Sequence, residues 1–129
     1  MITHLQKFLL ELGRGFSFVA RQKRITFDGR HFRIDLVFYN YILKCFVLID
    51  LKVGDLTHQD LGQMQMYVHY YERELMNEGD NPPIGIVLCA DKSESVVKYT
   101  LPENETQIFA PKYKLYLPSE EEPLRELEQ

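Results

Sequence analysis

Long apolar runs are missing from this 129-residue sequence, and cysteine is scarce. A transmembrane helix needs about 20 consecutive apolar residues, and no stretch approaches that length. The N-terminus also lacks the basic and then apolar pattern of a secretory signal peptide, which predicts a cytoplasmic protein without a membrane partner. Cys45 and Cys89 are the two cysteines, and both lie in apolar segments. We predict buried free thiols, because a zinc site needs more ligands at closer spacing.

The remaining composition is that of an ordinary globular protein, with 45% hydrophobic and 26% charged residues. We expect one domain over residues 1–129. Charge is unevenly distributed: residues 1–71 contain nine Lys and Arg against six acidic residues, and residues 72–129 contain six against thirteen. The basic excess is concentrated between Lys7 and Arg33. A local basic face of this kind can bind a polyanion, although on charge alone a merely solvated surface is the favoured alternative.

The spacing of apolar residues predicts an α/β fold, with a mixed central sheet flanked by helices in the order αβββαβ. The predicted helices cover residues 2–13 and 57–77, and an acidic helix follows Pro118. The predicted strands cover residues 16–20, 24–27, 31–40, 43–52, 84–90 and 113–117. Residues 92–99 fit a short helix or a strand equally well.

Two local signals fix the ends of these elements. Asp28-Gly29 is a strong hairpin signal, and Thr57 with Asp60 predicts a capping box at the start of the second helix. We expect Gly62 to let this helix approach the sheet closely. The predicted buried stripe of the helix consists of Leu61, Met64, Val68, Tyr71 and Leu75.

Two adjacent apolar segments contain charged residues. They are HFRIDLVFYN (residues 31–40) and LKCFVLIDLK (residues 43–52), and they contain Asp35, Asp50 and Lys52. Strand alternation places Phe32, Ile34, Leu36 and Phe38 on one face and Arg33, Asp35, Val37 and Tyr39 on the other. If the loop between the strands has an even number of residues, Asp35 shares a sheet face with Asp50 and Lys52. A register slip of one residue would separate them.

Two carboxylates so close together repel each other, and a divalent cation is the usual remedy. The sequence therefore predicts a metal-assisted site at Asp35 and Asp50. The alternative is a simple salt bridge between an aspartate and Lys52.

This arrangement resembles the active site of PD-(D/E)XK nucleases, in which one strand supplies an Asp and the next supplies an acidic-x-Lys triplet. Here Asp35 precedes Asp50-Leu51-Lys52, and QMQMY (residues 63–67) matches the Q-x-x-x-Y helix pattern of the RecB-like branch. Ile34 stands where that family has Pro.

A closer resemblance covers nearly the whole chain. The segments FLLELGRGFSFVARQ, FRIDLVFYN, FVLIDLKVG, LGQMQMYVHYYE, PPIGIVLCADK and YKLYLP are similar to the C-terminal nuclease domain of bacterial YhcG-like proteins. Asp50 stands where that family more often has Glu. The family usually has an N-terminal helical, DNA-binding region, so the resemblance implies that this chain is a fragment or a stand-alone module.

The resemblance implies roles for individual residues. Asp35, Asp50 and the Leu51 carbonyl are expected to bind Mg²⁺ or Mn²⁺, with Glu11 as a candidate further ligand. Lys52 is expected to orient water or stabilise developing charge.

The helix after these strands is expected to complete the site. Gln63 is the helical catalytic candidate, and Tyr67 and Arg33 are candidates for supporting the site or binding phosphate. Core packing is an equal alternative for Tyr67. Tyr39 and Tyr41 are further candidates for contact with nucleic acid.

The function expected from these residues is metal-dependent hydrolysis of DNA phosphodiester bonds. A catalytically silent, nuclease-like module for nucleic-acid binding or assembly is the alternative. A homo-oligomer and a separate targeting partner are further expectations.

Overall fold

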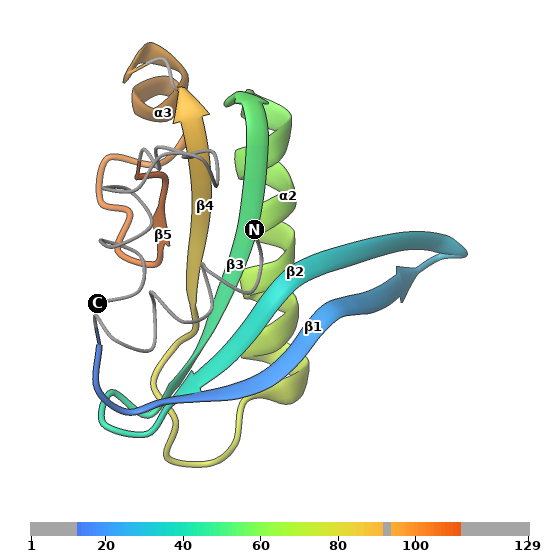
Figure 1. Cartoon of the computed structure of the whole chain (residues 1–129), viewed down its shortest axis with the longest axis vertical. Coiled ribbons are helices and arrows are strands. Elements are labelled where there is room, and N and C mark those ends of the chain that lie inside the picture. The colour runs from blue at the N-terminus through green and yellow to red at the C-terminus, as the bar shows by residue number, and fades with distance from the viewer. Residues whose placement is uncertain (1–12, 92–93, 112–129) are drawn as a thin grey trace, which may run out of the picture.

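One mixed sheet of five strands organises the described part of the chain (Figure 1). The computed structural model describes residues 13–91 and 94–111. The sheet order is β1-β2-β3-β4-β5; β1/β2 and β2/β3 pair antiparallel, and β3/β4 and β4/β5 pair parallel. The elements are β1 (Phe16–Phe27), β2 (Arg30–Asn40), β3 (Cys45–Asp55), α2 (His58–Tyr70), the π-helix η1 (Tyr71–Leu75), β4 (Ile84–Asp91), α3 (Glu94–Thr100) and β5 (Ile108–Phe109).

The predicted α/β architecture is therefore confirmed, with differences at several elements. The two predicted N-terminal strands form one continuous strand, β1. Residues 94–100 are helical, which resolves the open alternative for that segment. Strand β5 was not predicted. The helix predicted at residues 2–13, the strand at 113–117 and the acidic C-terminal helix lie outside the described residues, apart from Gly13.

Both antiparallel turns follow from their residues. Asp28 and Gly29 have φ angles of 51° and 79°, the left-handed pair that a two-residue hairpin turn requires. Residues 41–44 connect β2 to β3, and the side chain of Asn40 accepts hydrogen bonds from the N–H groups of Ile42 (3.0 Å) and Leu43 (2.9 Å). This loop has four residues, so the β2/β3 register has the predicted parity and pairs Leu36 with Ile49.

The far end of the β1/β2 hairpin projects beyond the sheet (Figure 1). We call residues 22–35 the distal hairpin. Strand β2 pairs with β3 only as far as Leu36, and beyond that point it pairs only with β1. Strand β1 has a register shift between Phe18 and Ala20, and Gln22 has a φ of 56° in mid-strand. These two irregularities lie where the hairpin leaves the sheet.

Opposite these irregularities of β1, the side chains of β2 no longer alternate strictly between the two faces of the sheet. Ile34 and Val37 belong to the core cluster that contains the residues of α2, whereas Leu36 and Phe38 belong to the cluster on the opposite face. The prediction that Ile34 and Leu36 share a face is therefore wrong. Strict alternation fails because the distal hairpin turns over α2, and its Phe32 packs on Tyr67.

Helix α2 begins as predicted and ends slightly earlier. Thr57 is the N-cap, and its backbone and side chain form a reciprocal capping box with Asp60. The predicted buried stripe is confirmed at four positions, but Leu75 is 38% exposed. The helix widens into a π-helical turn at Tyr71–Leu75, which changes the spacing on which the stripe depended.

The close contact between helix and sheet occurs at Gly85 rather than at Gly62. A Cβ at Gly85 on β4 would lie 2.6 Å from Met64 Cγ, whereas a Cβ at Gly62 would have open space around it. The expectation for Gly62 is wrong because this residue lies on the exposed face of α2. Gly85 therefore positions α2 against the centre of the sheet.

The sheet has an apolar core on each face. Leu48, Val87 and Cys89 pack with α2 on one face, and Val47, Ile49 and Leu88 belong to the cluster on the other. Both Cys45 and Cys89 are buried, and neither forms a disulfide bond within the described residues, as predicted. Within residues 13–91 and 94–111, no helix has the length and apolar character needed to cross a membrane.

Candidate active site

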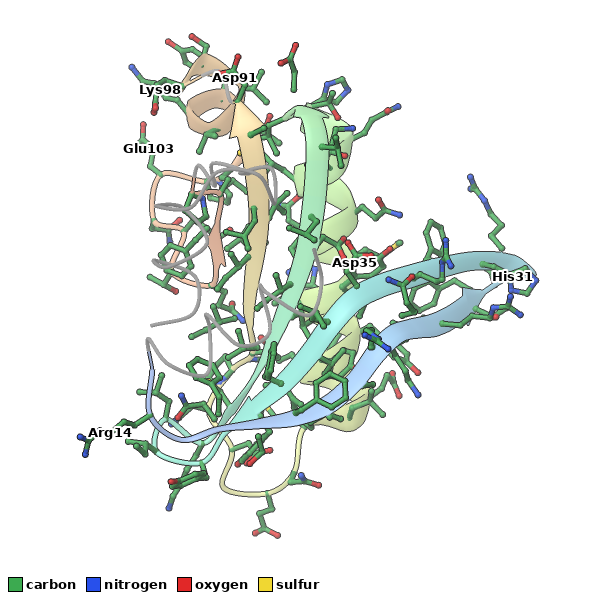
Figure 2. All side chains as sticks on the ribbon, viewed as in Figure 1. Arg14, His31, Asp35, Asp91, Lys98 and Glu103 are labelled. Carbon is green, nitrogen blue, oxygen red and sulfur yellow. The ribbon has the colours of Figure 1, made fainter. Side chains whose placement is uncertain are left out.

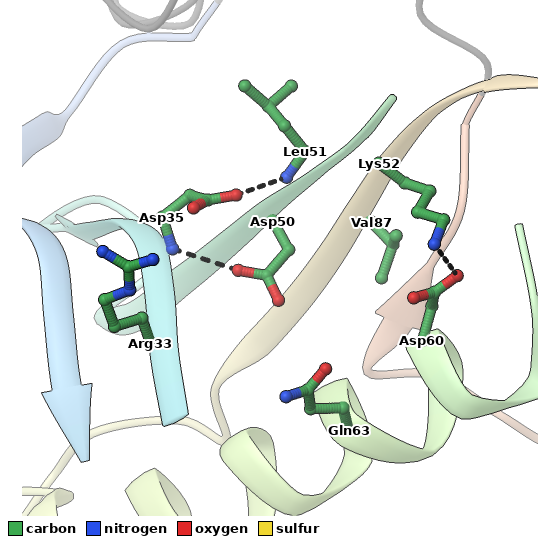
Figure 3. A pocket seen from close by; sticks show the side chains of 8 residues that line it. All are labelled: Arg33, Asp35, Asp50, Leu51, Lys52, Asp60, Gln63 and Val87. Atoms are coloured by element: carbon green, nitrogen blue, oxygen red, sulfur yellow. Dashed lines mark hydrogen bonds and ion pairs between the residues drawn. The ribbon is translucent and has the colours of Figure 1, made fainter. Parts of the chain in front are cut away.

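Asp35 and Asp50 are joined by a reciprocal arrangement across β2 and β3 (Figure 3). The backbone N–H of Asp35 donates to Asp50 Oδ1 at 3.0 Å. In return, Asp35 Oδ2 accepts from the backbone N–H of Leu51 at 2.8 Å. Each carboxylate thus accepts a hydrogen bond from a backbone N–H group just beyond the last regular β2/β3 pair. The structure brings the two predicted aspartates together.

The surroundings of Asp50 disfavour its ionised form. The pKa of its carboxyl group is raised from 3.8 to about 7, chiefly by burial and also by the negative charges of Asp35 and Asp60, while the hydrogen bond from the Asp35 backbone opposes the rise. Its second oxygen points into the space in front of Gln63 (Figure 3). A buried carboxyl group that resists ionisation gains from a cation or a proton.

Lys52 lies on β3 two residues after Asp50, and its side chain extends toward α2 (Figure 3). Its Nζ is 3.5 Å from Asp60 Oδ2, and the side chains are 35% and 20% exposed. Asp60 is also the acidic residue of the capping box, so one carboxylate closes the helix and holds Lys52. Among the described residues neither Asp35 nor Asp50 forms an ion pair, so Lys52 pairs with a third aspartate and not with either of these two.

Gln63 and Tyr67 face the sheet from consecutive turns of α2, but they occupy different environments. Gln63 lines the pocket and interacts with the Tyr67 hydroxyl group. Tyr67 is completely buried, and its hydroxyl group donates to the carbonyl oxygen of Arg33 at 3.2 Å. Burial raises the pKa of Tyr67, so the phenol remains protonated and keeps this bond. Tyr67 therefore holds β2 beside Asp35.

These side chains enclose a polar pocket of about 120 Å³ at the junction of β2, β3, β4 and α2. The pocket is lined by Arg33, Asp35, Asp50, Leu51, Lys52, Asp60, Gln63 and Val87 (Figure 3). Six of the predicted site residues, including Arg33, therefore converge on one cavity. Tyr67 lies behind it, and Glu11 lies outside the described residues.

The chemistry of these donors fits a hard divalent cation. Asp35 and Asp50 provide anionic oxygens from neighbouring strands, and Mg²⁺ is commonly bound by one or two carboxylates with several waters. The part of the chain that the structure describes contains no group of three or more His, Cys, Asp or Glu that could hold a metal. Two carboxylates with water or substrate oxygens are therefore the ligand set that these residues can provide.

Comparison with known proteins identifies the family. The family model for the YhcG PDDEXK nuclease domain matches residues 1–128. The chain belongs to this family. A protein of Escherichia coli (strain K12) named "Putative nuclease YhcG" is 42% identical over 127 residues, which cover 98% of this chain and 34% of that protein. The chain thus spans about a third of the length of this curated relative.

Solved structures confirm the fold of this YhcG-type nuclease domain. A repair endonuclease from Pyrococcus abyssi matches with a TM-score of 0.60 at 21% identity, over 88% of this chain and 47% of that one. A structure titled as an EndoMS complex with double-stranded DNA matches with a TM-score of 0.54 at 14% identity, over 84% of this chain and 44% of that one. Both likenesses are to restriction-endonuclease-like folds.

Two residues at the site of this YhcG-type domain were not among the predicted site residues. Gln22 of β1 lies opposite Asp35, and its Nε2 is 3.4 Å from Asp35 Oδ1. Asp60 was predicted only as a helix cap. Asp60 is an acidic residue in the first turn of the helix that follows the strand of Lys52, and this position was a usable sequence signal for it. The left-handed backbone of Gln22 had no sequence signal.

The two tyrosines considered for nucleic-acid contact differ in their surroundings. Tyr39 donates to Asp80 Oδ1 at 2.6 Å, and this bond raises the pKa of Tyr39. Tyr39 thereby ties β2 to the loop after η1. Tyr41 is 62% exposed at the β2/β3 turn.

Proposed function

We propose that this nuclease domain hydrolyses phosphodiester bonds of DNA with Mg²⁺ or Mn²⁺ as its cofactor. The observation that supports this most strongly is the convergence of Asp35 and Asp50, neither of which forms an ion pair within the described residues. Burial of Asp50 makes its ionised form expensive without a cation. Membership of a nuclease family gives this site its reaction class.

Asp35 and Asp50 would hold the cation, together with the Leu51 carbonyl and waters. When bound, such a metal supplies charge stabilisation at the phosphate and favours deprotonation of a water nucleophile. Hydrogen bonds from the backbone fix one oxygen of each carboxylate, so the two groups keep their positions before any ligand arrives. Glu11 is proposed as a further acidic ligand from the N-terminal segment.

Lys52 provides the positive side chain of the pocket. An ammonium group is a compact donor that can orient water or stabilise negative charge as the phosphodiester bond breaks. Its partner Asp60 is partly exposed, so the ion pair is weak enough for Lys52 to turn toward a bound phosphate. Asp60 would then act as the resting partner of Lys52.

The other lining residues have more modest roles. Gln63 lines the pocket and would donate to a water or to a phosphate oxygen there. Arg33 contributes a cation at the mouth of the pocket, while its carbonyl group is held by Tyr67. Tyr67 is thus a positioning residue in this proposal.

DNA is the proposed substrate for two reasons. The distal hairpin next to the pocket contains Lys23, Arg24, Arg30 and Arg33, all exposed. A structural neighbour with the same fold is described in complex with double-stranded DNA. A basic surface beside a carboxylate site suits a polyanionic strand whose scissile phosphate enters the pocket.

The direct test is cleavage of labelled single-stranded, duplex and branched DNA by the purified protein with Mg²⁺ or Mn²⁺. We expect products only with a divalent cation, no products in EDTA, and loss of cleavage in Asp35→Asn and Asp50→Asn. The matched control is Asp28→Asn, which removes the same charge at the exposed hairpin turn.

Two results would contradict the proposal. Equal cleavage by Asp50→Asn would place the activity elsewhere. Binding of DNA in EDTA with no cleavage of any form under any metal would favour the silent, nuclease-like binding module instead.

A further inference from the structure

Two arginines face each other across the distal hairpin. Arg24 of β1 and Arg33 of β2 are cross-strand partners, and both are exposed. Directly opposed residues of an antiparallel pair project from the same face of the sheet at close range. The two guanidinium groups therefore form one local concentration of positive charge.

The neighbouring contacts establish which face this is. On one face of the distal hairpin, Phe27 packs on Tyr70 and Phe32 packs on Tyr67, so this face is directed toward α2. The alternate positions contain Arg24 and Arg33, followed by Thr26 and His31, whose side chains are 2.9 Å apart. By the two-residue period of a strand, the arginine pair lies on the opposite face of the hairpin from Phe27 and Phe32.

Among the described residues neither Arg24 nor Arg33 forms an ion pair, and the one carboxylate on β2 is Asp35. Like charges directly opposite each other destabilise a sheet, and the ion pair found within residues 13–91 and 94–111 joins Lys52 to Asp60 instead. The pair is exposed and lies near the base of a projecting hairpin. An exposed pair of like charges that weakens the free protein is explained by an external anion.

The pair lies next to the candidate active site. Arg33 lines the same pocket as Asp35, which is two residues further along β2 (Figure 3). Two residues of extended strand span about 6.8 Å, which is comparable with the separation of successive phosphates along a nucleic-acid strand. The pocket that Asp35 lines and the arginine pair can therefore receive neighbouring phosphates of one strand.

We propose that Arg24 and Arg33 form a clamp for a backbone phosphate of the nucleic-acid substrate, one nucleotide away from the phosphate in the Asp35–Asp50 pocket. This inference rests on the proposed nuclease function and adds a binding subsite to it. Arginine suits the role because its planar fork binds phosphate oxygens in a bidentate manner. The clamp sets which way the strand runs across the pocket, from the pocket toward His31 at the hairpin end (Figure 2).

The distal hairpin is the part of the molecule that extends along such a path. It contains four Lys and Arg and two Asp, and one of these aspartates is Asp35 itself. Arg14 lies at the opposite end of the molecule from His31 in Figure 2 and is also exposed. Arg14 therefore provides a matched control with the same charge and a different location.

The test measures binding of labelled oligonucleotides to the wild-type protein and to Arg24→Gln, Arg33→Gln, the double variant and Arg14→Gln. All titrations contain EDTA, so cleavage does not interfere, and each is repeated over a range of NaCl concentrations. We expect each clamp variant to bind about tenfold more weakly at low salt. The slope of the logarithm of the binding constant against the logarithm of the salt concentration should decrease in magnitude by about one. Arg14→Gln should bind as the wild type does.

The double variant and the melting temperatures distinguish a clamp from a general loss of positive charge or of stability. If both arginines hold one phosphate, the double variant loses less than the product of the two single losses. Relief of charge repulsion should leave the melting temperature of Arg24→Gln unchanged or raise it. Equal effects of Arg24→Gln and Arg14→Gln, a lower melting temperature that accounts for the weaker binding, or no binding by the wild type would overturn the clamp.

Cleavage assays with Mg²⁺ keep this inference distinguishable from the proposed function. Cleavage by the wild type together with unimpaired Arg24→Gln at low substrate concentration would reject the clamp and leave the nuclease. If Arg24→Gln binds more weakly than the wild type and the wild type never cleaves, the nuclease function is rejected and the clamp remains. Oligonucleotides of both DNA and RNA show which sugar the subsite accepts.

Discussion

The N–H of Asp35 donates to Asp50 at 3.0 Å, while the carboxylate of Asp35 binds the N–H group of Leu51, the residue after Asp50. Each aspartate thus anchors its neighbour through the backbone, and the two negative charges remain close together. The folded protein keeps this pair although it raises the pKa of Asp50. Such an arrangement stores unfavourable electrostatic energy that a bound cation would relieve.

Asp50 is expected to make the metal-free protein less stable as the pH rises. The pKa of Asp50 in the folded state is about 7, above its ordinary value of 3.8. The folded state therefore binds the proton more tightly than the unfolded chain, and this stabilising contribution is present below about pH 4 and is lost as the pH rises through about 7. Since one pKa unit corresponds to 1.36 kcal/mol, the loss is at most about 4 kcal/mol.

Urea unfolding of the wild type and Asp50→Asn in EDTA measures this effect. Asp50→Asn lacks the titration, so its free energy of unfolding should exceed that of the wild type at pH 8 by more than it does at pH 4. Asp28→Asn should show no such divergence. Parallel pH profiles for the wild type and Asp50→Asn would contradict the raised pKa.

Lys52 is expected to matter for the reaction much more than for the fold. Its ion pair with Asp60 is partly exposed, so Lys52→Met should change the free energy of unfolding by less than about 1 kcal/mol. Loss of a positioned acid–base or charge-stabilising group should reduce the cleavage rate by about 10²–10⁴-fold. Single-turnover cleavage and thermal melting of the same variant provide both values. Lys98→Met on α3 is the control, and comparable rates for the two variants would exclude a role for Lys52.

Tyr67 is expected to act through the position of β2. Tyr67→Phe keeps the buried ring but removes the hydrogen bond to the carbonyl group of Arg33, which should cost about 1 kcal/mol of stability. The cleavage rate should fall while its dependence on metal concentration stays the same. Tyr39→Phe removes a hydroxyl that binds Asp80, away from the pocket lining, and should leave the rate unchanged. A rate for Tyr67→Phe equal to that of the wild type would show that this bond does not position the site.

Two glycines are expected to respond in opposite directions to alanine. Gly85→Ala would place a Cβ 2.6 Å from Met64 Cγ and 2.8 Å from Val68 Cγ2, so it should destabilise the fold by about 1–3 kcal/mol. Gly62→Ala has open space on the exposed face of α2 and should stabilise the protein by about 0.5–1 kcal/mol. Denaturant unfolding of both variants checks the pair. A destabilised Gly62→Ala would contradict the observed packing of α2.

The sequence was sufficient for features determined by short-range patterns. The Asp28-Gly29 turn, the Thr57 cap and the apolar run of β4 each follow from residues close together in the chain. The prediction that Asp35 and Asp50 meet required an even number of residues in the β2/β3 loop. The loop has four residues, which gives the predicted register.

Features determined by tertiary contacts were not predictable. The left-handed backbone of Gln22 and the turn of β2 at Asp35 arise where the hairpin leaves the sheet to cover α2. The close approach at Gly85 depends on how α2 lies over β4, which helical spacing alone does not reveal. Asp50 and Asp55 are both closer to Lys52 in the sequence than Asp60 is. Lys52 nevertheless pairs with Asp60, because side-chain direction rather than sequence separation determines its partner.

Calorimetric titration of the metal-free protein with Mn²⁺ tests most directly whether Asp35 and Asp50 form a cation site. The expected result is saturable binding to the wild type and to Asp28→Asn, with loss of that binding in both Asp35→Asn and Asp50→Asn. Identical binding isotherms for the wild type and the two site variants would contradict a cation site at these residues.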